Sequence, residues 1–191
     1  VCCSSAEGEM VTNGMSNYAR NGPFANSAVV VNIGPDDFSG ISPLSGLNFR
    51  SYWEQKAFAL GGNSFFAPAQ NLLDFLADKE SDHITRCTYR PGIKPARLRE
   101  TLPDYVVESL KKGFRQFETK MPGYLSGEAS MIGVETRTSS PVRIVRGEDL
   151  QSINAKGLYP CGEGAGYAGG IMSSALDGIR TAQALLKSLE T

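Results

Sequence analysis

Three glycines near the end of the chain have the spacing of a dinucleotide-binding turn. In the stretch GLYPCGEGAGYAGGIMSSALDGI, residues 157–179, Gly164, Gly166 and Gly169 form the pattern G-x-G-x-x-G. Such a turn binds a pyrophosphate within a βαβ unit of about 30 residues, with a ribose-binding acid about 20 residues further on. Only 21 residues follow Gly170, and one predicted helix takes up most of them. The sequence therefore argues against a complete unit of this kind.

The same loop has the features of a site for an electron-rich ligand. A helix is predicted to begin near Ile171, so the unpaired N–H groups of its first turn and the helix dipole produce a positive potential there. Glycines let a ligand approach the backbone closely. Glu163 disfavours a bare phosphate beside it, but its carboxylate can accept hydrogen bonds from a hydroxyl-rich chain. The alternative is that the glycines only let the helix and the preceding strand pack closely, and the residues leave both readings open.

Arginines and serines upstream of the loop form a second candidate site. Arg137, Arg143 and Arg146 lie around a turn that contains Ser139 and Ser140. An arginine could bind an anionic substrate or the cofactor, and the serines would add hydrogen-bond donors. The alternative is a hairpin whose arginines are solvated.

A polar cluster close to the N-terminus is the third candidate. Asn13, Ser16, Tyr18 and Arg20 follow one another in a predicted loop and could line the side of the site on which a substrate binds. The alternative is that Asn13 and Gly14 only form a turn and that the other side chains are exposed. No catalytic acid or base can be assigned from these residues.

The composition narrows the classes of function. The 191 residues carry a net charge of −1, so no basic excess points to nucleic acid, and no apolar run is long enough to span a membrane. With one histidine and four cysteines that form no C-x-x-C pair, no metal site is expected. Cys2 and Cys3 are adjacent, which suits a disulfide framework poorly and favours a reducing cytoplasm.

Hydrophobic periodicity predicts helices and strands in one chain, and hence an α+β fold with a mixed sheet. Helices are expected over residues 47–60, 67–79, 104–121 and from 171 to the end. Strands are expected over residues 27–33, 129–138, 141–146 and 157–161. Asp104 is the predicted N-cap of the third helix, and Asn13 with Gly14 is the predicted turn of a short hairpin.

Several stretches resemble one family of proteins. GLYPCGEGAGYAGGIMSSALDGI, GVETRTSSPVRIVR (133–146), VTNGMSNYAR (11–20), ANSAVVV (25–31) and APAQNLLDFL (67–76) match the C-terminal part of FAD-dependent dehydrogenases. These are mostly uncharacterised bacterial oxidoreductases, distantly related to the glutathione-reductase-like flavoproteins. Members carry their FAD-binding Rossmann turn well upstream. The resemblance implies that this chain is the C-terminal portion of a longer flavoprotein and lacks the N-terminal FAD-binding segment.

The resemblance also implies roles for individual residues. Glu163 would accept a hydrogen bond from a ribityl hydroxyl of FAD, and the helix N-terminus would face the pyrimidine edge of the isoalloxazine, favouring the anionic reduced flavin. The implied cofactor-binding residues are Gly162, Glu163, Gly164, Gly166, Gly169, Gly170, Ile171 and Met172. The substrate-side candidates are Arg137, Ser139, Ser140, Arg143, Asn13 and Ser16.

On this interpretation the chain has three parts. Residues 1–34 would hold strands shared with the flavin domain, residues 35–130 a mostly helical substrate-side domain, and residues 131–191 further strands with the flavin-binding loop and helix. The intact protein would be an oxidoreductase with a small-molecule substrate, and this chain alone would be inactive. Its partners would be the upstream FAD-binding segment and, in a homodimer, a second copy. The alternative is a cofactor-free module that binds a partner through its middle helices.

Overall fold

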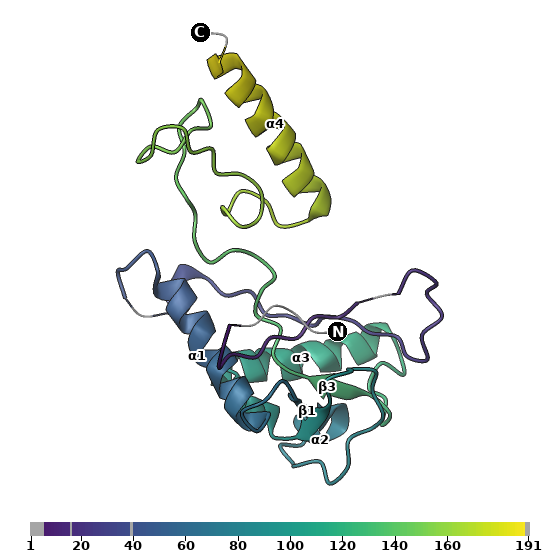
Figure 1. Cartoon of the computed structure of the whole chain (residues 1–191). Helices are drawn as coiled ribbons and strands as arrows, with labels where there is room; N and C mark the ends of the chain where they lie inside the picture. Colours follow the sequence, from purple (N-terminus) through teal and green to yellow (C-terminus); the bar gives the residue numbers. More distant parts are fainter. Residues whose placement is uncertain (1–5, 16, 39, 190–191) are drawn as a thin grey trace. The chain divides into compact units, whose positions relative to one another are not determined.

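The computed structural model describes residues 6–15, 17–38 and 40–189. Its elements in chain order are η1 (Pro35–Asp37), α1 (Ser45–Leu60), β1 (Ala67–Asn71), α2 (Leu72–Leu76), β2 (Ile93–Pro95), η2 (Leu98–Thr101), α3 (Asp104–Lys120), β3 (Ser130–Ile132) and α4 (Ile171–Leu189) (Figure 1). Helices and a small mixed sheet coexist in one chain, so the predicted α+β class is confirmed.

The chain divides into two compact units. Unit 1 takes the described residues of 1–37 and 49–136, and unit 2 those of 38–48 and 137–191. Unit 1 holds the sheet, with strand order β2-β1-β3. Strand β1 pairs in parallel with β2, where Ala67 lies opposite Ile93, and antiparallel with β3, where Ala69 lies opposite Ile132.

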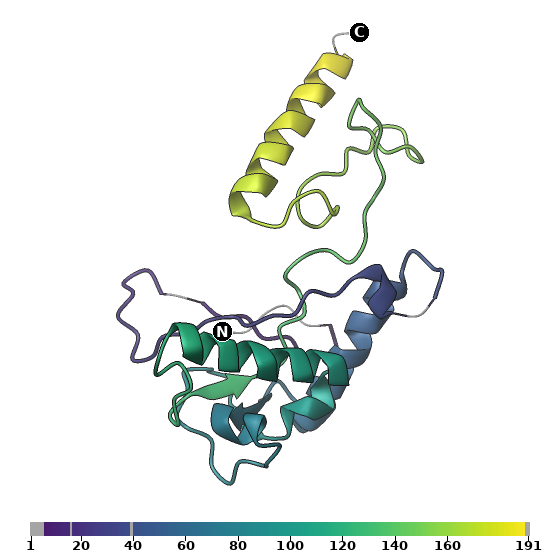
Figure 2. The same cartoon turned by 180° about the vertical axis from the view of Figure 1, so that it is seen from behind.

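Helix α3 supplies much of the core of unit 1. Val106, Leu110 and Phe114 recur at intervals of four residues, so they lie on one side of the helix and are buried. They pack with Leu72 and Phe75 of α2 in one hydrophobic cluster. Figure 2 shows α3 running beside the sheet. The periodicity therefore predicted the bounds of α3 to within one residue. It also predicted α1 to within two residues and the start of α4.

Asp104 was predicted to be the N-cap of α3, but the structure shows otherwise. Pro103 occupies that position, and Asp104 is the first helical residue. The proline preceding the helix has no N–H to satisfy, and the aspartate still places its negative charge at the positive end of the helix dipole.

The helix predicted over residues 67–79 is wrong in its first part. Residues 67–71 form strand β1, and only Leu72–Leu76 are helical. The buried amide of Gln70 favours the strand, because it donates to the carbonyl of Lys79 at 2.6 Å and accepts from the N–H of Leu98 at 2.9 Å. These long-range contacts fix the backbone of β1 and overrule the local helical pattern.

Three predicted strands and the predicted hairpin do not form either. Residues 27–33 run outside the sheet, and Val29 and Val31 pack partly buried against the core instead. Instead of a hairpin at Asn13, the N–H of Thr12 donates to the distant carbonyl of Val134 at 2.8 Å. Residues 141–146 and 157–161 form no strand and show only an isolated bridge at Arg146.

Truncating Phe114 tests the core of unit 1. Its side chain is 3% exposed, and its ring meets that of Phe75 edge-on at a centroid distance of 6.3 Å. We expect Phe114→Ala to lower the free energy of unfolding by about 3–5 kcal/mol, because it leaves a cavity between α3 and α2. Lys112→Ala, at an exposed position of α3, should change it by less than about 0.5 kcal/mol. Urea unfolding of both variants is the measurement, and equal effects would contradict the packing.

Candidate functional site

The glycine loop of unit 2 has a tight backbone that requires glycine at two positions. Gly162 and Gly166 have φ values of +71° and +83°, which L side chains rarely adopt. The loop closes on itself, since the N–H of Gly166 donates to the carbonyl of Glu163 at 2.9 Å and that of Tyr167 to the carbonyl of Gly162 at 3.0 Å. A Cβ added at Gly166 would lie 2.5 Å from the carbonyl oxygen of Val142. This glycine is therefore a packing requirement.

The segment before the loop donates hydrogen bonds to the carbonyl groups of the loop. The Oγ of Ser140 donates to the carbonyl of Gly164 at 3.2 Å, and the N–H of Ile144 donates to that of Ala165 at 3.2 Å. The Nε of Arg143 donates to the carbonyl of Gly166 at 3.0 Å. Two of the candidates from the arginine and serine cluster, Ser140 and Arg143, are thus brought directly to the glycine loop.

Several N–H donors of the loop and of the first turn of α4 remain available. Within the described part of the chain, the N–H groups of Gly164, Gly169, Ile171 and Met172 make no hydrogen bond. The first bonded N–H of α4 is that of Ser174, which donates to the carbonyl of Gly170 at 2.9 Å. A Cβ added at Gly164 would meet nothing within 4 Å, so open space lies above this residue.

Glu163 adds an acceptor to these donors. Its side chain is half-buried, and among the described residues it makes no hydrogen bond or ion pair. The loop thus offers backbone donors, the positive end of the α4 dipole and one carboxylate. A hydroxyl-rich ligand with an electron-rich ring edge suits this combination, because its hydroxyls can donate to the carboxylate while the ring edge accepts from N–H groups.

A nearly buried ion pair fixes the base of the loop. Arg146 and Asp177 form a two-pronged contact, with Nη2 to Oδ1 at 2.7 Å and Nη1 to Oδ2 at 3.0 Å, and their side chains are 10% and 12% exposed. Asp177 also accepts the N–H of Gly162 at 2.9 Å, and Arg146 donates to the carbonyl of Pro160 at 2.7 Å. The pair therefore joins α4 to both residues that flank Cys161 at the entrance of the loop.

Tyr167 covers this pair. Its ring centroid lies 3.7 Å from the guanidinium carbon of Arg146, a distance at which the ring attracts the cation. Its hydroxyl donates to the carbonyl of Ile144 and accepts the N–H of Arg146, both at 3.1 Å. Tyr167 thereby connects the glycine loop to the segment that precedes it.

The ion pair shifts the titration of both partners. The hydrogen bond from Arg146 lowers the pKa of Asp177 below its ordinary value, against a rise from burial and with a further lowering by the N–H of Gly162. The same hydrogen bond raises the pKa of Arg146. Both groups are therefore charged at neutral pH, and the pair stabilises the fold as an ion pair.

The other candidate residues are distributed over both units. Ser139 lies beside the loop, since its Oγ would be 3.6 Å from a Cβ at Gly169, and Arg137 lies part-buried in the same unit. Asn13 is an exposed residue of unit 1. Ser16 lies outside the described residues.

Sequence reasoning missed the two residues that organise the loop. Asp177 and Tyr167 were not selected, and Arg146 was considered as a ligand-binding or a solvated arginine. A signal was present: Asp177 sits in a helix whose apolar residues fall on another side, and a lone acid at such a position can serve a buried partner.

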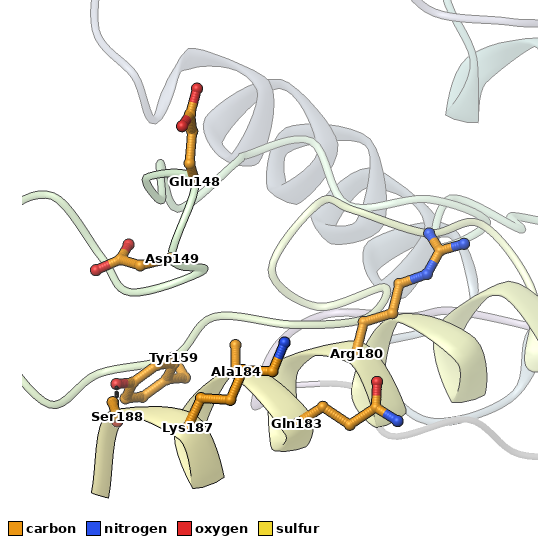
Figure 3. Close-up of a pocket in the computed structure, with 8 residues that line it drawn as sticks. All are labelled: Glu148, Asp149, Tyr159, Arg180, Gln183, Ala184, Lys187 and Ser188. Carbon is orange, nitrogen blue, oxygen red and sulfur yellow. Dashed lines mark hydrogen bonds between the residues drawn. The ribbon is translucent and has the colours of Figure 1, made fainter. Parts of the chain in front are cut away.

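A shallow hollow lies elsewhere on unit 2. It has a volume of about 520 Å³ and is lined by Glu148, Asp149, Tyr159, Arg180, Gln183, Ala184, Lys187 and Ser188 (Figure 3). The hydroxyl of Tyr159 lies 2.9 Å from that of Ser188 at its edge. None of the candidate site residues lines this hollow, so it is separate from the glycine loop.

The described residues include neither a metal site nor a membrane-spanning helix. No group of three or more histidine, cysteine, aspartate or glutamate side chains could hold a metal ion. No helix in this part of the chain combines the length and the apolar character needed to cross a membrane.

Comparisons with known proteins place the chain among flavoprotein-associated domains. More narrowly, it belongs to the family described as FAD-dependent protein, C-terminal domain-like, which matches residues 1–138. A protein of Clostridium beijerinckii, described as uncharacterized, is 47% identical over 192 residues and covers 100% of this chain. The chain spans 36% of the length of that relative. The glycine loop lies beyond the residues that match the family but within those that match the relative.

Replacing Asp177 tests the ion pair. We expect Asp177→Ala to lower the free energy of unfolding by about 3 kcal/mol, because it leaves the Arg146 guanidinium nearly buried without its partner. The wild-type contribution is present above the ordinary aspartate pKa of 3.8 and is lost as the pH falls through the lowered folded pKa. Denaturant unfolding between pH 7 and pH 2 should therefore show that the free energy of unfolding falls less on acidification in Asp177→Asn than in the wild type. Glu148→Gln, at an exposed position, should retain the wild-type profile.

Proposed function

We propose that this chain is the C-terminal part of an FAD-dependent oxidoreductase of the dehydrogenase type. Membership of the FAD-dependent C-terminal family supports a flavoprotein, and the geometry of the glycine loop supports its contact with the flavin and ribityl end of FAD. When bound, the flavin supplies the hydride or electron transfer. The observation that carries the proposal is the set of unbonded N–H groups at the exposed residues Gly164, Gly169, Ile171 and Met172, in the same loop as the unpaired carboxylate of Glu163.

Each loop residue then has a role in holding FAD. Glu163 accepts a hydrogen bond from a ribityl hydroxyl. Gly162, Gly164, Gly166, Gly169 and Gly170 let the cofactor approach the backbone or shape it for that approach. The N–H groups of Ile171 and Met172 face the pyrimidine edge and favour negative charge there, because they lie at the positive end of α4.

Arg143 and neighbouring polar residues form the substrate side of the proposed site. Arg143 uses Nε to hold the carbonyl of Gly166, while its exposed end retains donors for an anionic small-molecule substrate. Ser139, Ser140 and Arg137 extend this polar surface, and Asn13 and Ser16 stay substrate-side candidates on the strength of the sequence alone. The adjacent Cys2 and Cys3 support a reducing, cytoplasmic location for the protein.

A visible absorption spectrum tests the function. The chain is expressed together with the coding sequence that naturally precedes Val1 and purified without added cofactor. We expect flavin absorption bands shifted from those of free FAD. A colourless protein that also leaves the spectrum of added FAD unchanged would overturn the proposal.

Two substitutions in the same longer protein test the contact with the loop. Glu163→Ala should weaken flavin retention about 10- to 100-fold, because it removes a charged acceptor worth roughly 1.5–3 kcal/mol. Gly164→Ala should leave the melting temperature unchanged, since nothing lies within 4 Å of the added Cβ, yet lower flavin affinity by filling the approach to the loop. Gly113→Ala in α3, also with nothing within 4 Å, is the matched control. Flavin content unaffected by both loop variants would refute the contact.

A further inference from the structure

Two Asn-Gly pairs lie close together in the N-terminal part of the chain. They are Asn13-Gly14 and Asn21-Gly22. Asparagine is one of the chemically labile residues, because the nitrogen of the following peptide group can attack its amide carbon and close a five-membered ring. A following glycine makes this closure easiest, since it has no Cβ to obstruct the approach and leaves the backbone free to rotate. The surroundings of each pair therefore decide how readily it reacts.

The first pair is restrained on both sides. Before it, the N–H of Thr12 donates to the carbonyl of Val134 at 2.8 Å. After it, the carbonyl of Met15 accepts the Nδ2 of Asn26 at 3.3 Å. The side chain of Asn26 also lies against Gly14, since a Cβ added to this glycine would be 2.5 Å from the Oδ1. The backbone of the first pair is therefore held by contacts with other parts of the chain.

The second pair has no such restraint. Every residue from 17 to 28 is exposed, and among the described residues neither Asn21 nor Gly22 makes a hydrogen bond. The backbone contact just before the pair is local, from the N–H of Arg20 to the carbonyl of Asn17 at 2.9 Å. In both views the dark purple segment around residue 20 is a loop that stands away from the helices and the sheet of unit 1 (Figures 1 and 2). The peptide nitrogen of Gly22 is therefore free to turn toward the amide carbon of Asn21.

We propose that Asn21 is a site of spontaneous covalent modification, which converts it into aspartate and isoaspartate. The peptide nitrogen of Gly22 loses its proton and forms a bond to the amide carbon of Asn21, and the bond from that carbon to the amide nitrogen breaks. The amide group takes up the proton and leaves as ammonia, so that a succinimide ring remains. Water then adds to either carbonyl of the ring and opens it. No oxidant, reductant or second protein takes part.

The products change the charge of the loop. Either one adds a negative charge at position 21, beside the exposed Arg20, to a chain whose net charge is −1. Isoaspartate also lengthens the main chain, because the chain then runs through the former side chain. Arg20 belongs to the polar cluster near the N-terminus that could line the substrate side, and a neighbouring carboxylate would offset its positive charge there. This consequence rests on the function proposed above, whereas the modification itself does not.

Gly22 offers a substitution that slows the reaction and leaves the fold intact. Its φ lies outside the left-handed region, and a Cβ added to it would meet only the carbonyl oxygen of Phe24, at 3.9 Å. Gly22→Ala is therefore compatible with the structure, while its methyl group hinders the closure of the ring. Asn21→Gln is the second variant, because its longer side chain keeps the amide but would have to close a six-membered ring. The pair Asn13-Gly14 of the same molecule is the matched control.

Peptide mapping of the longer natural polypeptide, aged under native conditions in mildly alkaline buffer, measures the reaction. Mass spectrometry follows the small mass gain that accompanies the exchange of an amide for a carboxylate at each asparagine. We expect Asn21 to react about tenfold faster than Asn13 or more, because Asn13 reacts only when its segment opens locally. Gly22→Ala and Asn21→Gln should abolish this difference at an unchanged melting temperature. In denaturant, which releases Asn13, the two wild-type pairs should react at similar rates.

Three results would overturn the proposal. The first is an equal rate at the two pairs in the folded protein, or a faster reaction at Asn13. The second is an Asn21 that reacts in denaturant but not in the folded protein, because another part of the longer polypeptide would then hold it. The third is a rate at position 21 that Gly22→Ala leaves unchanged, since this would exclude attack by the peptide nitrogen. The flavin spectrum of the sample before ageing reports separately on the proposed function.

Discussion

The ion pair between Arg146 and Asp177 is the contact on which unit 2 depends. With Pro160 and Ala165 as its buried apolar side chains among the described residues, this unit gains little from hydrophobic burial. The pair instead connects α4, the entrance of the loop at Pro160 and Gly162, and the ring of Tyr167. A polar network takes the place that a hydrophobic core has in unit 1, where clusters around Phe75 and Phe114 hold α2 and α3.

These contacts determine which backbone groups of the loop are engaged in hydrogen bonds. Asp177 holds the loop at Gly162, and the segment with Ser140 and Arg143 binds the loop carbonyls at Gly164 and Gly166. Among the described residues, the N–H groups at the start of α4 stay without a hydrogen bond, as do the N–H of Gly164 and the carboxylate of Glu163. For the function proposed above, a turn whose backbone is already anchored would reduce the ordering cost of binding a ligand.

Sequence reasoning recovered the elements whose stabilising contacts are local and failed where they are distant. The spacing of Val106, Leu110 and Phe114 is a helical signal that tertiary contacts reinforce, so α3 was predictable. Strand β1 was not, because its conformation depends on Gln70 reaching Lys79 and Leu98. The candidate loop was found from glycine spacing alone. Its anchor was not, since 31 positions separate Arg146 from Asp177 and no local pattern joins them.

The glycines of the loop do not all have the same explanation. Sequence reasoning treated close packing and the approach of a ligand as alternatives for the whole pattern. Gly166 is needed for packing, because a side chain there would collide with the backbone at Val142. Gly164 has no such constraint, since nothing lies within 4 Å of an added Cβ, and close packing gives no reason for a glycine there. The two residues are two positions apart, and only Gly166 has close neighbours within the unit. The spacing G-x-G-x-x-G therefore does not have one cause, and packing within unit 2 explains the glycine at 166 but not the one at 164.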